Sequence, residues 1–211
     1  MAQPGRHRSS GRPVLAWAEP TGSLGSVTAP YEIRLIGDPV LRQRAGEITD
    51  VDGRLARLAA DMLTTMYDAP GLGLAAPQVG VQKRLFVYDV GEGPQVVVNP
   101  EIRESRGEWA YDEGCLSIPE LAFELIRPKE VHLVGYDLDG NEISIEADEL
   151  TARCFQHEMD HLDGILFIER LDDDDRRAAM KFIREQKLDA QDLLDAEIAA
   201  PAASRSGFSL R

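Results

Sequence analysis

The sequence has little cysteine and few aromatic residues, and it has no long apolar run. Among its 211 residues there are two cysteines, so it cannot carry the disulfide framework of a small secreted protein. We therefore expect a reducing compartment. No apolar stretch reaches the roughly 20 residues that a membrane-spanning helix needs, and none near the start resembles a signal peptide. We expect no membrane association.

Basic residues are also scarce relative to acidic ones. The chain has 37 acidic and 23 basic residues, which give a formal net charge of −14. Such a charge repels phosphates, so we expect no DNA binding and no broad binding of nucleic acids. The content of 43% hydrophobic and 28% charged residues is typical of a soluble globular protein. The length allows one well-cored domain with extensions.

The two ends of the chain differ from its middle. Residues 1–30 are rich in Gly, Ser, Pro and Arg, and they contain no acidic residue before Glu19. We predict a flexible extension there, in a cytoplasmic protein of bacterial type. An organellar transit peptide has a similar composition and remains the alternative, although no clear amphipathic pattern is present. Residues 31–171 are predicted to form the main domain, and residues 172–211 an acidic helical extension with a frayed end.

Hydrophobic periodicity predicts an α+β fold. Apolar residues at helical spacing favour an amphipathic helix over residues 52–69, and a second helix is predicted from about Glu149 to Leu162, stopped by Gly164. Strands are predicted at 83–90, 95–100 and 165–168, and a hairpin at 132–146. The strands mostly follow one another through short turns, which indicates antiparallel sheets rather than a doubly wound sheet. We expect these sheets to pack around the second helix, with the first helix and a C-terminal helix added.

The segment "HEMDH" within that second helix is the first functional signal. His157 and His161 are four residues apart, so on a helix their Cβ atoms lie roughly 5–6 Å apart and both rings can reach one ion. Glu158 projects to the side, where it can act as a general base on water at the metal. A solvated helix with scattered charges is the alternative, because this short motif also occurs by chance.

A catalytic metal site needs a third protein ligand. No histidine follows His161, and Glu169 and the acidic run at 172–175 are the only nearby acids. Upstream, Cys115 in "YDEGCLSIP" can supply a thiolate. A free cysteine is more often a small buried hydrophobe, and composition alone would favour that role.

The glycine-rich segment "GLGLAAPQVG" at 71–80 is the third signal. Its glycines permit close approach of a ligand to the backbone, and Gln78 can donate hydrogen bonds from its amide. The segment lacks the lysine of a phosphate-binding loop. An ordinary loop between a helix and a strand is the alternative.

Taken in order, "GLGLAAPQ", "EGCLS" and "QHEMDHLDG" resemble the three signature motifs of the peptide deformylase family. The resemblance covers roughly residues 31–171. It implies metal-dependent hydrolysis of the N-formyl group of formyl-methionine on newly made polypeptides. It also implies a divalent ion, Fe²⁺ as the native metal, with Zn²⁺, Ni²⁺ or Co²⁺ able to substitute. The residues that the motifs assign are Cys115, His157 and His161 as metal ligands, Glu158 as general acid and base, and Gln78 with the backbone N–H of Leu116 as oxyanion donors.

The resemblance also suggests how the peptide is held. Leu72 and Cys154 are expected to line an apolar slot for the methionine side chain, with Leu121 and Phe155 as further candidates. The backbone around Gly73 is expected to pair with the extended substrate, as in strand addition.

Four supporting residues have more than one interpretation. Glu113 and Arg127 form a charged pair beside the metal loop, or they are two unrelated surface charges. Gln156 is a candidate brace for the loop of Cys115. Asp160 is a candidate partner of His132 or of a backbone N–H, or it faces water.

The acidic C-terminal extension bears on partners. Some members of the family dock on the ribosome through a basic C-terminal helix. Residues 172–198 hold nine acidic and five basic residues here, which favours at most weak ribosome association. Two other functions remain open: a metallopeptidase or other amidase that would not need Cys115, and a metal-binding or peptide-binding protein without catalysis. Glu158 argues against the latter, because a pure binding site has no use for a base.

Overall fold

The structure is a computed structural model, and it describes residues 29–199, with side chains described as far as residue 186. Most of the N-terminal extension predicted for residues 1–30, and the frayed end at 200–211, lie outside the described residues. The chain divides into two compact units between Leu171 and Asp172. Among the described helices, none has the length and apolar character needed to cross a membrane.

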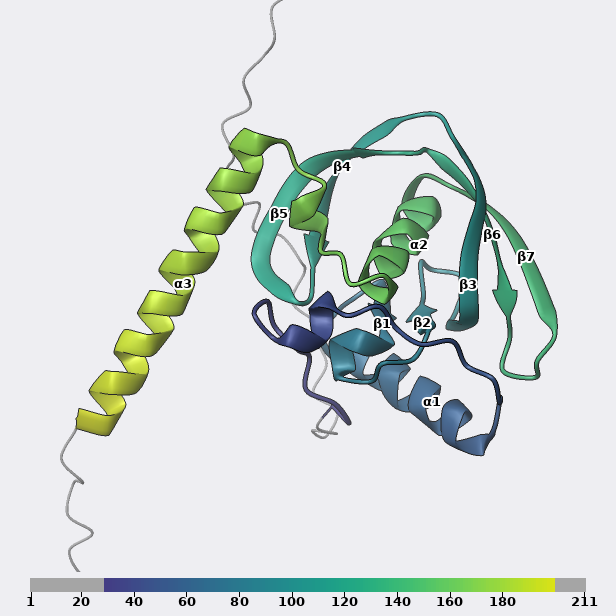
Figure 1. The fold of residues 1–211 in the computed structure, drawn as a ribbon, viewed down its shortest axis with the longest axis horizontal. Helices are drawn as coiled ribbons and strands as arrows, with labels where there is room; N and C mark the ends of the chain where they lie inside the picture. Colours follow the sequence, from purple (N-terminus) through teal and green to yellow (C-terminus); the bar gives the residue numbers. More distant parts are fainter. Residues whose placement is uncertain (1–28, 200–211) are drawn as a thin grey trace, which may run out of the picture. The chain divides into compact units, whose positions relative to one another are not determined.

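The described residues of the first unit form seven strands, two α-helices and three 3-10 helices. Figure 1 shows their arrangement. The strands are β1 (Gly73–Ala75), β2 (Leu85–Tyr88), β3 (Gln95–Arg106), β4 (Trp109–Cys115), β5 (Ile118–Arg127), β6 (Glu130–Tyr136) and β7 (Glu142–Asp148). The helices of this unit are α1 (Gly53–Asp68) and α2 (Glu149–Leu162), with short 3-10 helices η1 (Pro39–Arg42), η2 (Ala76–Val79) and η3 (Phe167–Glu169). The second unit contains α3 (Asp173–Ala199).

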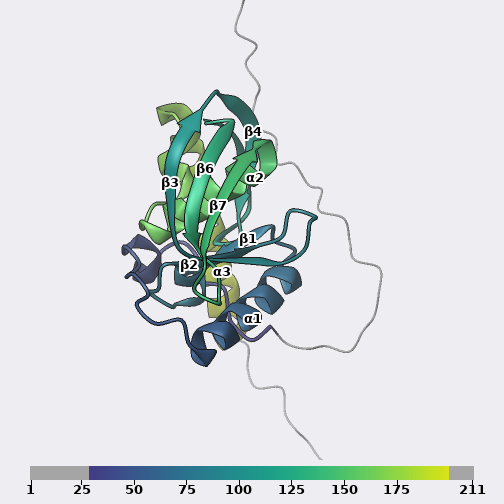
Figure 2. The ribbon, with the colours of Figure 1, turned by 90° about the vertical axis from the view of Figure 1, so that its right-hand side faces the viewer.

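The strands form two sheets. Five strands pair in the order β1-β2-β3-β6-β7, and β4 and β5 form a separate two-stranded sheet. Every strand pairing is antiparallel, which confirms the predicted α+β class with antiparallel sheets. Figure 2 shows β3, β6 and β7 side by side. The hairpin predicted at 132–146 is the β6–β7 pair, and its turn is held by the Asp137 side chain, which accepts from the backbone N–H groups of Asp139 and Asn141.

The start of the larger sheet is buried on both faces, because a helix covers each one. Along β2, Leu85 and Val87 pack with the apolar stripe of α1. The alternate residues Phe86 and Tyr88 pack with α2, as the two-residue side-chain period of a strand requires. Helix α2 therefore lies within the core of the unit (Figure 1).

The ends of the two helices have local causes. Asp52 caps α1 by accepting from the backbone N–H groups of Arg54 and Leu55, each at 3.0 Å. Helix α2 ends before Gly164, which has φ +76° as predicted for a C-terminal glycine. A Cβ at Gly164 would lie 2.8 Å from the carbonyl carbon of Arg42, so the close chain approach there also requires glycine.

Two parts of the predicted secondary structure were wrong or missing. The strand predicted at 165–168 is wrong, because η3 (Phe167–Glu169) occupies this region and its apolar residues are buried. Strands β1, β4 and β5 were not predicted, although β4 carries Cys115 as its last residue.

Candidate metal centre

Three side chains from the two distant motifs meet in the first unit. Cys115 ends β4, and His157 and His161 lie one turn apart on α2. One ligand atom from each residue lies within 4.8 Å of the others. The Sγ atom of Cys115 is 3.2 Å from Nε2 of His161. The structure therefore brings together the three residues that the sequence proposed, and Cys115 is not part of an apolar core cluster.

Local structure explains where Cys115 points. The β4–β5 ladder shifts its register between Gly114 and Cys115, so that Gly114 pairs with Ala122 whereas Cys115 pairs with Ile118. A register shift of this kind bends a strand and redirects a side chain. The partners on α2 have a rigid base, because that helix is packed inside the core.

A buried carboxylate holds one of the histidine rings. Nδ1 of His157 lies 2.7 Å from Oε1 of Glu113, which leaves Nε2 of that ring for an ion. Arg127 donates to both oxygens of Glu113, at 2.8 and 2.7 Å, which confirms the predicted charged pair. Burial alone would raise the pKa of Glu113, but His157 and Arg127 outweigh it and hold that pKa well below its ordinary value.

The two histidines have opposite electrostatic environments. Burial alone would lower the pKa of His157, but Cys115 and Glu113 raise it well above its ordinary value. Burial, together with the charge of His157, holds the pKa of His161 well below its ordinary value. Nδ1 of His161 is buried and has no hydrogen-bond partner within residues 29–199.

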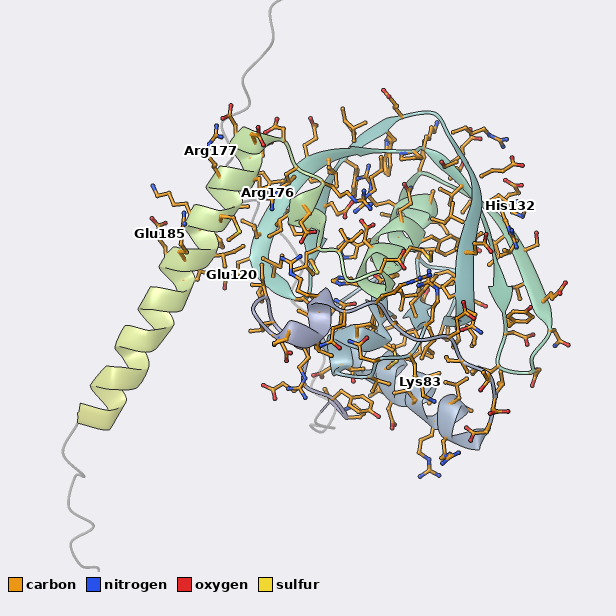
Figure 3. The ribbon with its side chains drawn as sticks, in the orientation of Figure 1. Lys83, Glu120, His132, Arg176, Arg177 and Glu185 are labelled. Carbon is orange, nitrogen blue, oxygen red and sulfur yellow. The ribbon has the colours of Figure 1, made fainter. Side chains whose placement is uncertain are left out.

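Two supporting predictions were wrong. Asp160 does not contact His132: it accepts from Nη1 of Arg127 at 2.8 Å and from Nη2 of Arg170 at 2.6 Å. His132 lies on β6 at the edge of the unit, within 2.8 Å of Oγ of Ser144 (Figure 3). The reason is electrostatic, because two guanidinium groups bring permanent positive charges and several hydrogen-bond donors to this buried carboxylate.

Gln156 does not brace the loop of Cys115. Its amide donates instead to the carbonyl groups of Pro128 and Ala152, at 2.9 and 3.0 Å. Gln156 therefore ties α2 to the segment between β5 and β6.

Glu158 is buried beside the glycine-rich segment. It is 3% exposed, and its Oε2 atom has no hydrogen-bond partner among the residues that the structure describes. Burial raises the pKa of Glu158 to about 7, against the opposing effect of the charge on His157. A Cβ at Gly73 would lie 2.4 Å from Oε1 of Glu158, so the absence of a side chain at Gly73 leaves the space that this carboxyl group fills. A carboxyl group with such a pKa and one free oxygen can accept and return a proton near neutral pH.

Gln78 is held close to the cysteine. Its Oε1 accepts from the backbone N–H of Ala75 at 2.8 Å, and its Nε2 donates to Oγ of Ser117 at 3.2 Å and lies 3.9 Å from Sγ of Cys115. Because the carbonyl end of the amide is fixed, the NH₂ end faces the metal-ligating residues. Leu116, next to Cys115, is half-buried.

The residues expected to hold the peptide lie nearby, with one exception. The thiol of Cys154 donates to the carbonyl oxygen of Leu72 at 3.7 Å, and a Cβ at Gly73 would lie 2.8 Å from Sγ of Cys154. Leu121 is half-buried. Phe155 is fully buried and packs against aromatic rings of β2, so it belongs to the core.

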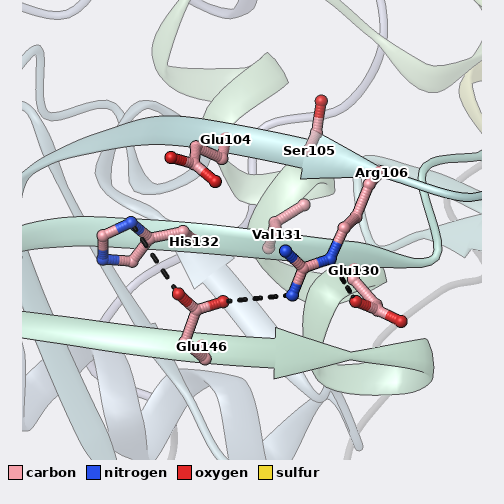
Figure 4. Close-up of a pocket in the computed structure, with 7 residues that line it drawn as sticks. All are labelled: Glu104, Ser105, Arg106, Glu130, Val131, His132 and Glu146. Carbon is pink, nitrogen blue, oxygen red and sulfur yellow. Dashed lines mark hydrogen bonds and ion pairs between the residues drawn. The ribbon is translucent and has the colours of Figure 1, made fainter.

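A pocket on the larger sheet is lined by none of these residues (Figure 4). Three acidic and basic side chains of this pocket pair with one another: Nε of Arg106 is 2.5 Å from Glu130, and its Nη2 is 4.0 Å from Glu146. Glu146 also lies 4.0 Å from Nδ1 of His132. These contacts are surface ion pairs between side chains on neighbouring strands, so Arg106, Glu130 and Glu146 already have partners.

The three ligating residues fit a transition-metal ion. One sulfur and two imidazole nitrogens form a three-ligand set of the catalytic type, which leaves a further coordination position open. The buried setting and the carboxylate on Nδ1 of His157 are the supports that such a ligand requires.

Comparisons with known proteins agree with this geometry. The family model described as polypeptide deformylase matches residues 30–177. A peptide deformylase of Acidothermus cellulolyticus is 51% identical over 153 residues, which cover 72% of this chain and 85% of that protein. The crystal structure of the peptide deformylase of Thermus thermophilus is 44% identical, with a TM-score of 0.72, and covers 77% of this chain and 98% of that one. The peptide deformylase of Synechococcus elongatus, solved in complex with actinonin, is 39% identical with the same TM-score of 0.72, over 77% of this chain and 90% of that one.

An α+β fold with a Cys–His–His group whose two histidines are buried, seen together with these relatives, defines a hydrolase. The family match covers more than half of the chain, and the curated relatives are about half identical to it. The chain belongs to the peptide deformylase family.

Proposed function

We propose that the chain removes the formyl group from the N-terminal formyl-methionine of nascent polypeptides, giving formate and a free α-amine, with the residues assigned below. The observation that carries the proposal is the meeting of Cys115, His157 and His161 within 4.8 Å, beside the buried carboxyl group of Glu158.

Cys115, His157 and His161 would hold one divalent ion, with Fe²⁺ as the native metal and Zn²⁺, Ni²⁺ or Co²⁺ as substitutes. Such an ion lowers the pKa of water to about 7 and polarises the formyl oxygen. The thiolate and iron are both open to oxidation. We therefore expect activity that decays in air with iron and persists with nickel.

Glu158 would act twice in one turnover. Its carboxylate takes a proton from the water that attacks the formyl carbon, and the resulting carboxylic acid gives that proton to the departing amine as the C–N bond breaks. The carboxyl group ends as it began, so one residue serves as base and then as acid. The pKa of about 7 and the unpartnered Oε2 atom support this role.

Gln78 and the backbone N–H of Leu116 would stabilise the oxyanion. The amide of Gln78 is already oriented by its bond from Ala75, so little reorganisation is needed as charge develops. Loss of one such donor costs about 3 kcal/mol of activation free energy.

The peptide would lie along the edge formed by residues 71–73. Strand β1 pairs with β2 on one side only among the described residues, and the other edge is available for strand addition. Leu72, Gly73 and Cys154 would line the start of the slot for methionine. Actinonin, which is bound in the Synechococcus elongatus structure, serves as a probe: we expect it to compete with a formyl-methionine peptide.

The rest of the chain is proposed to serve this reaction indirectly. Residues 31–171 would form the catalytic domain, and the division of compact units after Leu171 supports this limit. Residues 1–30 and 172–211 would be extensions. The acidic composition of residues 172–198 favours no more than weak association with the ribosome, and the location proposed is the cytoplasm.

The test measures formate release from formyl-Met-Ala-Ser and methionine release from unformylated Met-Ala-Ser, both with metal content determined. Formate without methionine supports the proposal. Methionine release would indicate a metallopeptidase, and neither product at full metal occupancy would indicate a binding protein. Glu158→Gln should keep the metal and lose nearly all turnover, and a variant with retained turnover would exclude Glu158 as the base. For the ligand role, Cys115→Ser should weaken metal binding or change the preferred metal.

A further inference from the structure

The pairing of strands in the five-stranded sheet does not fix the position of Cys115 relative to the two histidines. The β4–β5 hairpin, which ends near Cys115, forms its own two-stranded sheet. Helix α2, which carries His157 and His161, packs against the five-stranded sheet. The separation of the three ligand atoms therefore depends on side chains that cross between α2 and the hairpin.

Arg153 makes three of the crossing bonds. It lies on α2, one turn before His157, and it is 4% exposed. Its Nη1 donates to the carboxylate of Glu113 at 3.0 Å and to the carbonyl oxygen of Leu125 at 2.9 Å. Its Nη2 donates to the carbonyl oxygen of Trp109 at 2.6 Å, and its guanidinium carbon lies 5.3 Å from the centre of the Trp109 ring. One side chain of the helix thus holds both strands of the hairpin.

These bonds lead directly to the candidate ligands. Glu113, which Arg153 holds through Oε2, stands two residues before Cys115 and orients the His157 ring through Oε1. Arg127 cannot replace this link, because it lies on β5 and its pair with Glu113 stays within the hairpin. Its bond to Asp160 is a second crossing, at the other end of the helix.

We propose that Arg153 is a positioning residue, which fixes the hairpin bearing Cys115 against the helix bearing His157 and His161 and so sets the affinity of the metal site. This inference rests on the proposed function, since it takes those three residues as the ligands. Only a planar guanidinium can make all three bonds at once, because a lysine ammonium is a single point charge on a flexible stem.

The test uses the full chain, stripped of metal and titrated anaerobically with Co²⁺. A cobalt–thiolate absorption band reports the participation of Cys115, and the titration gives the dissociation constant. Arg153→Lys retains the positive charge opposite Glu113 but lacks the planar guanidinium group. Arg153→Gln serves as a second variant. Arg106→Lys is the matched control, because Arg106 also pairs with a glutamate, Glu130, but lies on the larger sheet. Thermal unfolding of each metal-free variant is recorded in parallel.

We expect Arg153→Lys to raise the dissociation constant for Co²⁺ by about 10–100-fold, the range found when groups that orient metal ligands are changed. The thiolate band should weaken or shift, and Arg106→Lys should match the unmodified chain. If an Arg153 variant has a lowered unfolding midpoint but an unchanged dissociation constant for Co²⁺, Arg153 only stabilises the fold, and the proposal is overturned. Failure of both Arg153 variants to fold would assign the residue to folding and overturn it as well.

The proposed function fails separately from this inference. If the unmodified chain binds Co²⁺ without a thiolate band, Cys115 is not a ligand and the metal site itself is wrong. If the unmodified chain shows the band and Arg153→Lys shows the same band and affinity, only the role of Arg153 is wrong.

Discussion

Replacing Gly73 by alanine tests whether the space above Glu158 matters for turnover. The added Cβ would lie 2.4 Å from Oε1 and 2.9 Å from Cδ of Glu158, and 2.8 Å from Sγ of Cys154. Ordinary contacts of a Cβ begin near 3.4 Å, so the carboxyl oxygen must move by about 1 Å. The atom that must move is the end of the Glu158 side chain rather than backbone, and the loss is therefore expected mainly in catalysis.

The magnitude follows from that displacement. A misplacement of about 1 Å at a reacting group costs on the order of 100-fold in rate. Overpacking of a closely filled site costs about 1–3 kcal/mol in the free energy of unfolding. We expect Gly73→Ala to lose about 100-fold in formate release, to unfold at a lower urea concentration, and to keep its metal, because the three atoms nearest to the added Cβ belong to Glu158 and Cys154 rather than to the candidate ligands.

The assay compares formate release, bound metal and urea unfolding for Gly73→Ala and for Gly53→Ala. Gly53 begins α1, and a Cβ there would meet nothing within 4 Å, so that control should keep full turnover and gain about 0.4–1 kcal/mol. Unchanged turnover in Gly73→Ala would refute the argument that Glu158 depends on this space. Loss of the metal in that variant would show that the substitution disturbs the ligands instead.

Two further predictions concern stability. Asn99 has φ +48°, and its side-chain amide accepts from the N–H of Ile48 at 2.9 Å and donates to the carbonyl oxygen of Ile48 at 2.8 Å. Asn99→Ala should therefore lower the free energy of unfolding, measured in urea, by about 2–4 kcal/mol. A backbone hydrogen bond from Leu55 and the side-chain bond from Arg54 lower the pKa of Asp52 in the folded chain. The stability that this cap contributes is therefore fully present above the unfolded pKa of about 3.9, and it is lost as the pH falls through the lowered folded value. The unfolding midpoint should therefore fall less between pH 5 and pH 2 for Asp52→Asn than for the unmodified chain. An equal fall in both proteins would contradict this prediction.

The sequence predicted the ends of α2 well because several signals coincide there. The helical spacing of its apolar residues, the pair of histidines four apart and a glycine after the last turn all indicate one helix that ends near Leu162. The strand predicted at 165–168 failed for a physical reason. Leu166, Phe167 and Ile168 are all buried, and a fully apolar run has no alternation that would separate a strand from a turn of helix.

Strands β4 and β5 were missed because their inward positions carry charges. Glu113 and Arg127 occupy buried positions where an ordinary strand would place apolar side chains, so the usual alternation does not appear in the sequence. The role of Arg153 was missed for the same reason, since an arginine on a helix is normally read as solvent-facing. The pairing of Glu113 with Arg127 was one of two interpretations that the sequence allowed, and the structure adds that Arg153 joins this pair.

The separate β4–β5 sheet has a consequence for handling the protein. An ion shared between Cys115 and the histidines of α2 would act as a removable cross-link between two pieces that no backbone ladder joins. At a free ion concentration 100 times the dissociation constant, such a link adds about 2.7 kcal/mol to the folded state. A chelator would then lower the stability of the fold as well as inactivate the protein. In a brief protease digest of the metal-free protein, the first cleavage should fall in the β4–β5 hairpin.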